Sequence, residues 1–139
     1  MAITARSMKR ALELKLHEYN ITSSQYTVLE VLGKYNGLSL TELGNLLHFD
    51  KPTITGIIDR MARAKLIRRR RNRNDRRDIQ VYLTPKGCEL QPELSKIANS
   101  INEKAVDNFN LSDKKAILNL TKQIYINSTN DNSNQEKKK

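Results

Sequence analysis

Apolar residues recur at helical spacing along most of this chain, and the spacing changes to every second residue in one stretch. A helical period places apolar side chains on one face of a helix, whereas a period of two places them on one face of a strand. The pattern predicts helices over 2–19, 22–33, 39–47 and 50–64, strands over 66–71 and 79–83, and two further helices within 85–126. From 127 onward the sequence is polar and unpatterned, which predicts a disordered tail over 127–139.

Three of the predicted helices begin with residues that can satisfy the free N–H groups of a first helical turn. Thr22 and Gln25 form one capping box, and Ser39 and Glu42 form a second. Asp50 is a strong N-cap for the third of these helices, because its carboxylate can accept a hydrogen bond from the N–H of residue 53. These caps fix where the helices begin, and they say nothing about function.

The helix that begins at Asp50 has an apolar face and a small, basic outer face. The apolar face consists of Ile54, Ile57, Ile58 and Met61. The outer face and its flanks consist of Pro52, Thr53, Thr55, Gly56, Asp59, Arg60 and Arg63. A helix that enters a DNA major groove needs little bulk where the bases approach and cations where the phosphates pass. For this helix alone, an ordinary solvated surface is the alternative.

The two predicted strands form a hairpin with a turn over 72–75, and the hairpin is rich in arginine. Seven of the ten residues from Arg68 to Arg77 are arginine. A two-stranded ribbon is barely stable in water, so repulsion among these guanidinium groups brings no folding benefit. A soluble edge strand is one explanation. A wing that follows the phosphates and reaches a minor groove explains the arginines better.

The order helix, helix, helix, basic hairpin predicts a winged helix-turn-helix, so the fold class is mainly α with a small β-hairpin wing. The winged lobe spans 21–87 of a single domain over 1–126. The flanking helices, 2–19 and 85–126, are predicted to form a homodimer through their apolar stripes. The stripes include Leu12, Leu16, Leu94, Ile97, Ile101, Leu120 and Ile124. The alternative is that these stripes pack against one another within one chain.

The distribution of charge along the chain indicates what kind of partner the protein binds. The 139 residues carry a net charge of +10, and Lys51–Arg77 contains eleven basic residues against two aspartates, a net of +9. Because the imbalance is concentrated in the predicted helix and wing, the partner is expected to be a polyanion.

The remaining composition excludes several classes of function. The single cysteine, Cys88, cannot form an internal disulfide or a cysteine-pair zinc site, and His17 and His48 lack the spacing of metal ligands. We find no nucleophile–base pattern, no phosphate-binding glycine loop and no metal motif, so neither an enzyme nor a cofactor is expected. The sequence has no apolar run of the ~18 residues that a membrane span needs. Its first residues do not resemble a signal peptide, so a cytoplasmic location is expected.

With these residues in view, the chain resembles the MarR family of winged helix-turn-helix transcriptional regulators over about 21–87. The stretches similar to family helices are TSSQYTVLEVL (22–32), LSLTELGNLL (38–47) and, in the recognition helix, Thr53-Ile54-Thr55. The most specific similarity is to the family's wing signature of Asp-x-Arg, a strand and Leu-Thr-x-x-Gly. It consists here of Asp75, Arg77, the strand 79–83 and Thr84-Pro85-Lys86-Gly87.

The resemblance implies a homodimeric repressor that binds a pseudo-palindromic operator in double-stranded DNA and is released by a small-molecule effector. It also implies that Arg77 enters the minor groove and that Asp75 holds its guanidinium. Gly56 departs from the long polar side chain that family members often carry, which lowers the expected stringency of base recognition. The alternative is an architectural or RNA-associated winged helix without a defined operator. The residues predicted to contact DNA are Lys51, Thr53, Thr55, Gly56, Arg60, Arg63, Arg68, Arg70, Arg73, Asp75, Arg76 and Arg77.

Overall fold

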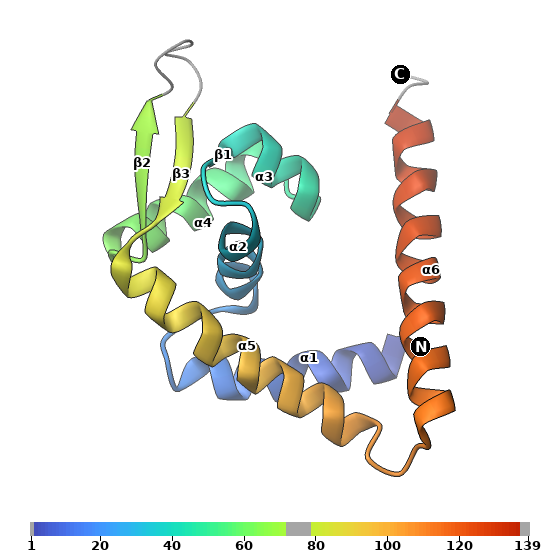
Figure 1. The fold of residues 1–139 in the computed structure, drawn as a ribbon. Helices are drawn as coiled ribbons and strands as arrows, with labels where there is room; N and C mark the ends of the chain where they lie inside the picture. The colour runs from blue at the N-terminus through green and yellow to red at the C-terminus, as the bar shows by residue number, and fades with distance from the viewer. Residues whose placement is uncertain (1, 72–78, 137–139) are drawn as a thin grey trace. The chain divides into compact units, whose positions relative to one another are not determined.

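A computed structural model describes residues 2–71 and 79–136, with side chains as far as Ser128 (Figure 1). Contacts between residues divide the chain into two compact units, Met1–Asn102 and Glu103–Lys139, and each is described separately. The prediction of a single domain over 1–126 stays a prediction.

The described chain is mainly helical with one small antiparallel sheet, as the sequence predicts. The elements are α1 (Ala2–His17), α2 (Ser23–Lys34), β1 (Leu38–Ser39), α3 (Leu40–Leu47), α4 (Lys51–Arg63), β2 (Ile67–Arg71), β3 (Ile79–Leu83), α5 (Pro85–Ala105) and α6 (Leu111–Glu136). The sheet has the order β1-β3-β2, so the hairpin has a third strand that the sequence pattern did not predict. β1 is only two residues long, too short to show a period of two.

The strand β1 is held beside β3 by backbone and side-chain hydrogen bonds. Leu38 lies opposite Val81 in the sheet, and the N–H of Gly37 donates to the carbonyl of Val81 at 3.0 Å. The side chain of Asn36 accepts from the N–H of Leu83 at 2.9 Å. The segment between α2 and α3 therefore also covers one edge of the hairpin.

The core of the first unit gathers one apolar face from each of its elements. Its buried apolar side chains are Leu16, Ile21, Val28, Leu29, Leu32, Leu43, Ile54, Ile57, Ile58, Met61, Leu66, Ile67, Val81, Leu83 and Leu94. Leu16 and Leu94 were predicted to serve a dimer interface, but each is 0% exposed in this core. For these two positions the alternative, packing within one chain, is correct, because α1 and the first half of α5 cover the winged lobe.

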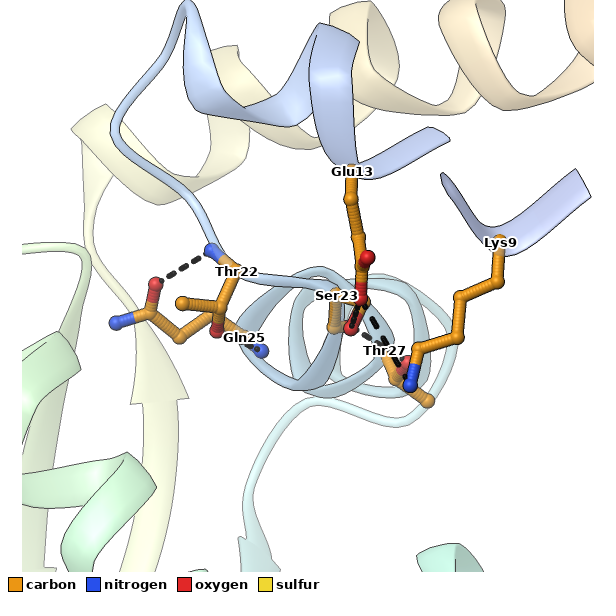
Figure 2. A network of polar contacts seen from close by, with 6 residues as sticks. All are labelled: Lys9, Glu13, Thr22, Ser23, Gln25 and Thr27. Atoms are coloured by element: carbon orange, nitrogen blue, oxygen red, sulfur yellow. Dashed lines mark hydrogen bonds and ion pairs between the residues drawn. The ribbon is translucent and has the colours of Figure 1, made fainter. Parts of the chain in front are cut away.

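The two predicted capping boxes are confirmed. The N–H of Gln25 donates to the Thr22 hydroxyl at 3.2 Å, and the N–H of Thr22 donates to the Gln25 side chain at 2.9 Å (Figure 2). Ser39 and Glu42 form the same reciprocal pair. Figure 2 also shows the Ser23 hydroxyl donating to Glu13 at 3.2 Å, a contact that joins the start of α2 to α1.

Three helices end with a residue in the left-handed conformation. Asn20, His48 and Lys65 have φ angles of 55°, 53° and 59°. After each of them, the next N–H bonds to the carbonyl five residues before it, in the pattern of a Schellman motif. These bonds run from Ile21 to Leu16 at 3.1 Å, from Phe49 to Gly44 at 2.9 Å and from Leu66 to Met61 at 3.0 Å. The tight turn between α3 and α4 follows from the second of these ends.

Replacing Lys65 by glycine is expected to raise the free energy of unfolding by about 1 kcal/mol. A non-glycine residue in the left-handed region pays roughly this much, because its Cβ approaches the backbone. Thermal and urea unfolding of Lys65→Gly measure the change. The control is Lys51→Gly, in the first turn of α4, which is expected to lose stability because glycine is a poor helix former. A stability of Lys65→Gly at or below that of the parent contradicts the expectation.

The segment from Thr84 to Gly87 joins α5 to the end of α4. The Thr84 hydroxyl donates to the carbonyl of Lys65 at 2.7 Å and accepts from the N–H of Gly87 at 3.2 Å. The ammonium of Lys86 donates to the carbonyl of Ala64 at 3.1 Å. Gly87 is buried, and a Cβ built on it would lie 2.2 Å from the carbonyl oxygen of Leu66. The threonine and the glycine of the predicted wing signature thus form the junction between α4, β2 and α5.

The second unit consists of the end of α5 and the helix α6. The helix α6 begins at Leu111, after Asn110, whose side chain accepts a hydrogen bond from the N–H of Asp113 at 2.9 Å. The disordered tail predicted from 127 differs from the structure, because α6 continues to Glu136. The sequence has no proline or glycine after Pro92, so neither of these residue types ends α6 early. Exposed apolar side chains on α6 are Leu111, Ile117, Leu118, Leu120, Ile124, Tyr125 and Ile126.

Candidate nucleic-acid interface

The helix α4 turns its small, basic face away from the core, as predicted. Ile54, Ile57, Ile58 and Met61 are all buried. Of the residues predicted to contact DNA, Lys51, Thr53, Arg60 and Arg63 are exposed, and Thr55 and Gly56 are partly exposed. Asp50 caps the helix by accepting from the N–H of Thr53 at 2.8 Å. The exposed face of α4 therefore has the shape and charge that a groove-binding helix needs.

Two threonines at the start of α4 have polar partners within the protein. The Thr55 hydroxyl donates to the carbonyl of Lys51 at 2.7 Å, so its proton points back along the helix. The Thr53 hydroxyl, and then its backbone N–H, lowers the pKa of Asp50 by hydrogen bonding to the carboxylate. Thr55 is partly exposed, and its side chain carries a methyl group and a hydroxyl oxygen. These groups can contact a thymine methyl or accept from a base amino group.

Gly56 leaves open space on the outer face of α4. A Cβ at this position would meet one neighbour, the guanidinium Nη1 of Arg60, at 3.6 Å, which is ordinary van der Waals contact. The end of the Arg60 side chain therefore lies close to the helix beside Gly56. A larger side chain at 56 would fit without strain, so no crowding within the protein requires glycine here.

The arginines of β2 alternate between the two faces of the sheet. Arg68 lies opposite Tyr82, Arg69 opposite Val81 and Arg70 opposite Gln80. Arg69 is on the face that turns toward α4, where its guanidinium forms an ion pair with Asp59. Sequence reasoning missed this pair, because ten residues separate its members and only the return of β2 beside α4 brings them together.

Arg68 and Arg70 lie on the other face of the sheet, and both are exposed. Their guanidinium carbons lie 5.9 Å and 5.7 Å from the centre of the Tyr82 ring, which is within the range of a cation–π interaction. The predicted contacts at these two positions are therefore compatible with the structure. Arg73, Asp75, Arg76 and Arg77 fall outside the described residues, so their roles stay predictions.

A groove of about 500 Å³ lies elsewhere in the first unit, between α1, α2 and α5. Its wall includes the apolar side chains of Met8, Leu12 and Ile101 together with Lys9 and Tyr26. Burial, and then the charge of Glu30, raises the pKa of Tyr26 to about 12, although a hydrogen bond with Ser95 lowers it. Tyr26 therefore lines the groove as a neutral, partly buried side chain whose hydroxyl is paired with Ser95.

Among the residues that the structure describes, no group of three or more metal-binding side chains occurs. Over the same ranges, no helix is long and apolar enough to cross a membrane.

Comparisons with known proteins identify the family. A sequence profile described as the MarR family matches residues 21–79. The organic hydroperoxide resistance transcriptional regulator of Bacillus subtilis (strain 168) is 31% identical over 98 residues, which cover 70% of this chain and 67% of that protein. The chain belongs to the MarR family. The HTH-type transcriptional regulator TtmR of Methylorubrum extorquens (strain PA1) is 31% identical over 82% of this MarR-family chain, but the match spans only 57% of TtmR.

Solved structures of MarR-family proteins share the fold. A MarR transcriptional regulator from Methanosarcina mazei Go1 superposes with a TM-score of 0.86 at 28% identity, covering 91% of each chain. A MarR-family protein from Listeria monocytogenes, solved in complex with 26mer DNA, superposes with a TM-score of 0.85 at 21% identity. That superposition covers 94% of this chain and 87% of the other. At this identity the likeness to the Listeria protein establishes the fold alone.

Proposed function

We propose that this MarR-family protein is a transcriptional regulator that binds double-stranded DNA in a sequence-specific manner. The observation that carries the proposal is the presence, in one compact unit, of an exposed small and basic face on α4 beside a strand of four arginines. A helix with such a face fits the major groove, and an adjacent basic wing fits the flanking phosphates and minor groove. The relatives reported above are regulators by name, and one structural neighbour was solved with DNA.

A binding selection from random duplex DNA, followed by sequencing, tests the proposal. Enrichment of a motif with two-fold symmetry is the expected result, because a two-fold dimer reads two equivalent half-sites. The second candidate is an architectural or RNA-associated winged helix, which Gly56 favours because this glycine offers no side chain to a base. Selection without any enriched motif favours that candidate over the regulator.

We further propose that the protein is a homodimer that represses by occupying a pseudo-palindromic operator. The exposed apolar side chains of α6 support this, because helices of soluble proteins normally bury such a face. A dimer that joins two copies of α4 also doubles the contact with DNA. We also propose a cytoplasmic location, since the operator of such a regulator would lie there.

Light scattering is expected to give the mass of two chains at micromolar concentration, and Leu120→Glu is expected to shift it toward one chain. Leu120 is 64% exposed on α6. A two-fold interface would bury this side chain from both chains, so the substitution removes its apolar contribution to dimer stability twice. The dissociation constant of the dimer should rise at least ~10-fold. Lys122→Glu, a neighbouring exposed position on the same helix, is the control. A parent protein that stays at one chain on concentration contradicts the dimer.

The groove between α1, α2 and α5 is the site we propose for a small-molecule effector. It combines apolar walls with the aromatic side chain of Tyr26 and the ammonium of Lys9, which suits an apolar molecule that carries an acidic group. Lys9 also pairs with Glu13 at 3.7 Å, so an anionic group would compete with that carboxylate (Figure 2).

A further inference from the structure

Tyr82 in β3 packs against the backbone at Gly37, and two arginine side chains of β2 lie near its ring. Gly37 has a φ of 94°, and a Cβ built on it would lie 2.8 Å from a carbon of the Tyr82 ring. The ring therefore lies directly against the backbone of residue 37. The Tyr82 hydroxyl donates to the side chain of Gln80 at 3.0 Å, which fixes the far end of the ring.

The sheet register brings two cations to this ring. Arg68 lies directly across from Tyr82, and Arg70 lies across from Gln80, two residues along on the same face. Their guanidinium carbons are 5.9 Å and 5.7 Å from the ring centre. Since one ring lies within reach of both guanidinium groups, it limits the motion of two long side chains that otherwise extend into solvent.

An aromatic ring and a carboxylate can both hold an arginine side chain in place, but they leave different amounts of its charge and hydrogen-bonding capacity available. Asp59 holds Arg69 through an ion pair, which occupies an N–H donor of the guanidinium and offsets its charge with a carboxylate. The Tyr82 ring carries no charge and attracts the cation through its π face, so the full charge and the N–H donors at the edge remain available. The three arginines are thus all held, but Arg68 and Arg70 are the two of them without a carboxylate that competes with an incoming anion.

We propose that Tyr82 is a positioning residue for nucleic-acid binding, which holds Arg68 and Arg70 ready for backbone phosphates without neutralising them. The inference rests on the proposed function and assigns a residue to it that lies outside the predicted contact set. The advantage is entropic, because the side chains are ordered before the phosphate arrives. Tyr82 itself touches no phosphate in this mechanism.

Salt titrations of binding to mixed-sequence duplex DNA test the role. Tyr82→Leu is expected to weaken binding about three- to tenfold. It should leave the slope of log K against log salt unchanged, because both charges are still present. Tyr82→Phe keeps the ring and should bind within twofold of the parent, apart from the lost bond to Gln80. Circular dichroism confirms that each variant is folded.

A double-mutant cycle separates this role from simple support of the sheet. In a background of Arg68→Gln and Arg70→Gln, Tyr82→Leu should have no further effect on DNA binding. An equal loss in both backgrounds overturns the proposal, because the ring then acts on the sheet and not on the arginines. If the parent protein binds no duplex DNA, the proposed function fails.

NMR spectroscopy of the parent protein without DNA tests whether Arg68 and Arg70 lie near the Tyr82 ring in solution. The side-chain δ protons of Arg68 and Arg70 are expected to shift upfield in the NMR spectrum of the parent protein, because they lie near an aromatic ring. Those of Arg71, which has no such ring partner in the part of the chain described, serve as the reference. Shifts of Arg68 and Arg70 equal to those of Arg71 overturn the inference even where DNA binding is normal.

Discussion

Gly87→Ala is expected to lower the free energy of unfolding by about 3 kcal/mol. The added Cβ would meet the carbonyl oxygen of Leu66 at 2.2 Å and a methyl group of Leu83 at 3.2 Å. The first of these neighbours is backbone, and it cannot move away like the end of a flexible side chain. It also belongs to the turn that Thr84 holds through hydrogen bonds, so relief of the clash must separate α5 from the end of α4.

Urea unfolding followed by circular dichroism measures the change, and Gly56→Ala provides the matched control. Gly56 lies inside a helix and has open space around it, so alanine there should stabilise the protein by about 1 kcal/mol through better helix propensity. The two substitutions are chemically identical, and their effects are expected to have opposite signs. A Gly87→Ala variant as stable as the parent would mean that the backbone at the junction of α4, β2 and α5 can move at little cost, despite the hydrogen bonds of Thr84.

Replacing Arg68 and Arg70 together by glutamine is expected to weaken binding to duplex DNA by about 100-fold. Each charge-assisted contact with a phosphate contributes roughly one factor of ten. The slope of log K against log salt should fall in magnitude by about 1.8, because each phosphate contact releases about 0.9 counterion from B-DNA. The loss should be similar for operator and random DNA, since phosphate contacts carry no sequence information.

Arg69→Gln is the control for this experiment, because it removes the same chemical group from the same strand. Arg69 is paired with Asp59, so its substitution should change the salt slope by much less than either neighbour does. Asp59→Asn should act in the opposite direction and strengthen binding to random DNA by releasing that cation. Equal slopes for the Arg68, Arg69 and Arg70 variants would show that the ion pair opens when DNA binds.

Local sequence predicted most of the fold because the helix starts are encoded by adjacent residues. The two capping boxes and the Asp50 cap each need only a span of four residues, and all three are present in the structure. The positions where helices end were harder to predict from the sequence. Asn20 is a residue type that often adopts the left-handed conformation, whereas Lys65 adopts it without such a preference.

The apolar stripes show how much the periodic spacing of apolar residues can predict about packing. They identify the buried face of each helix, and the faces of α4 were predicted correctly from them. They do not say what covers that face. Leu16 and Leu94 were assigned to a dimer from their spacing, yet both lie in the core of one chain, because a stripe looks the same whichever surface it meets.

The sequence by itself determined the order of the elements, the concentration of positive charge in α4 and the wing, and the family resemblance that the comparisons confirm. Only the tertiary structure decided how the arginines are used. Arg69 meets Asp59, Arg68 and Arg70 meet Tyr82, and Gly87 meets the backbone of Leu66. Strand register and helix packing set these contacts, and neither can be calculated from local patterns, because each depends on which distant segments the fold brings together.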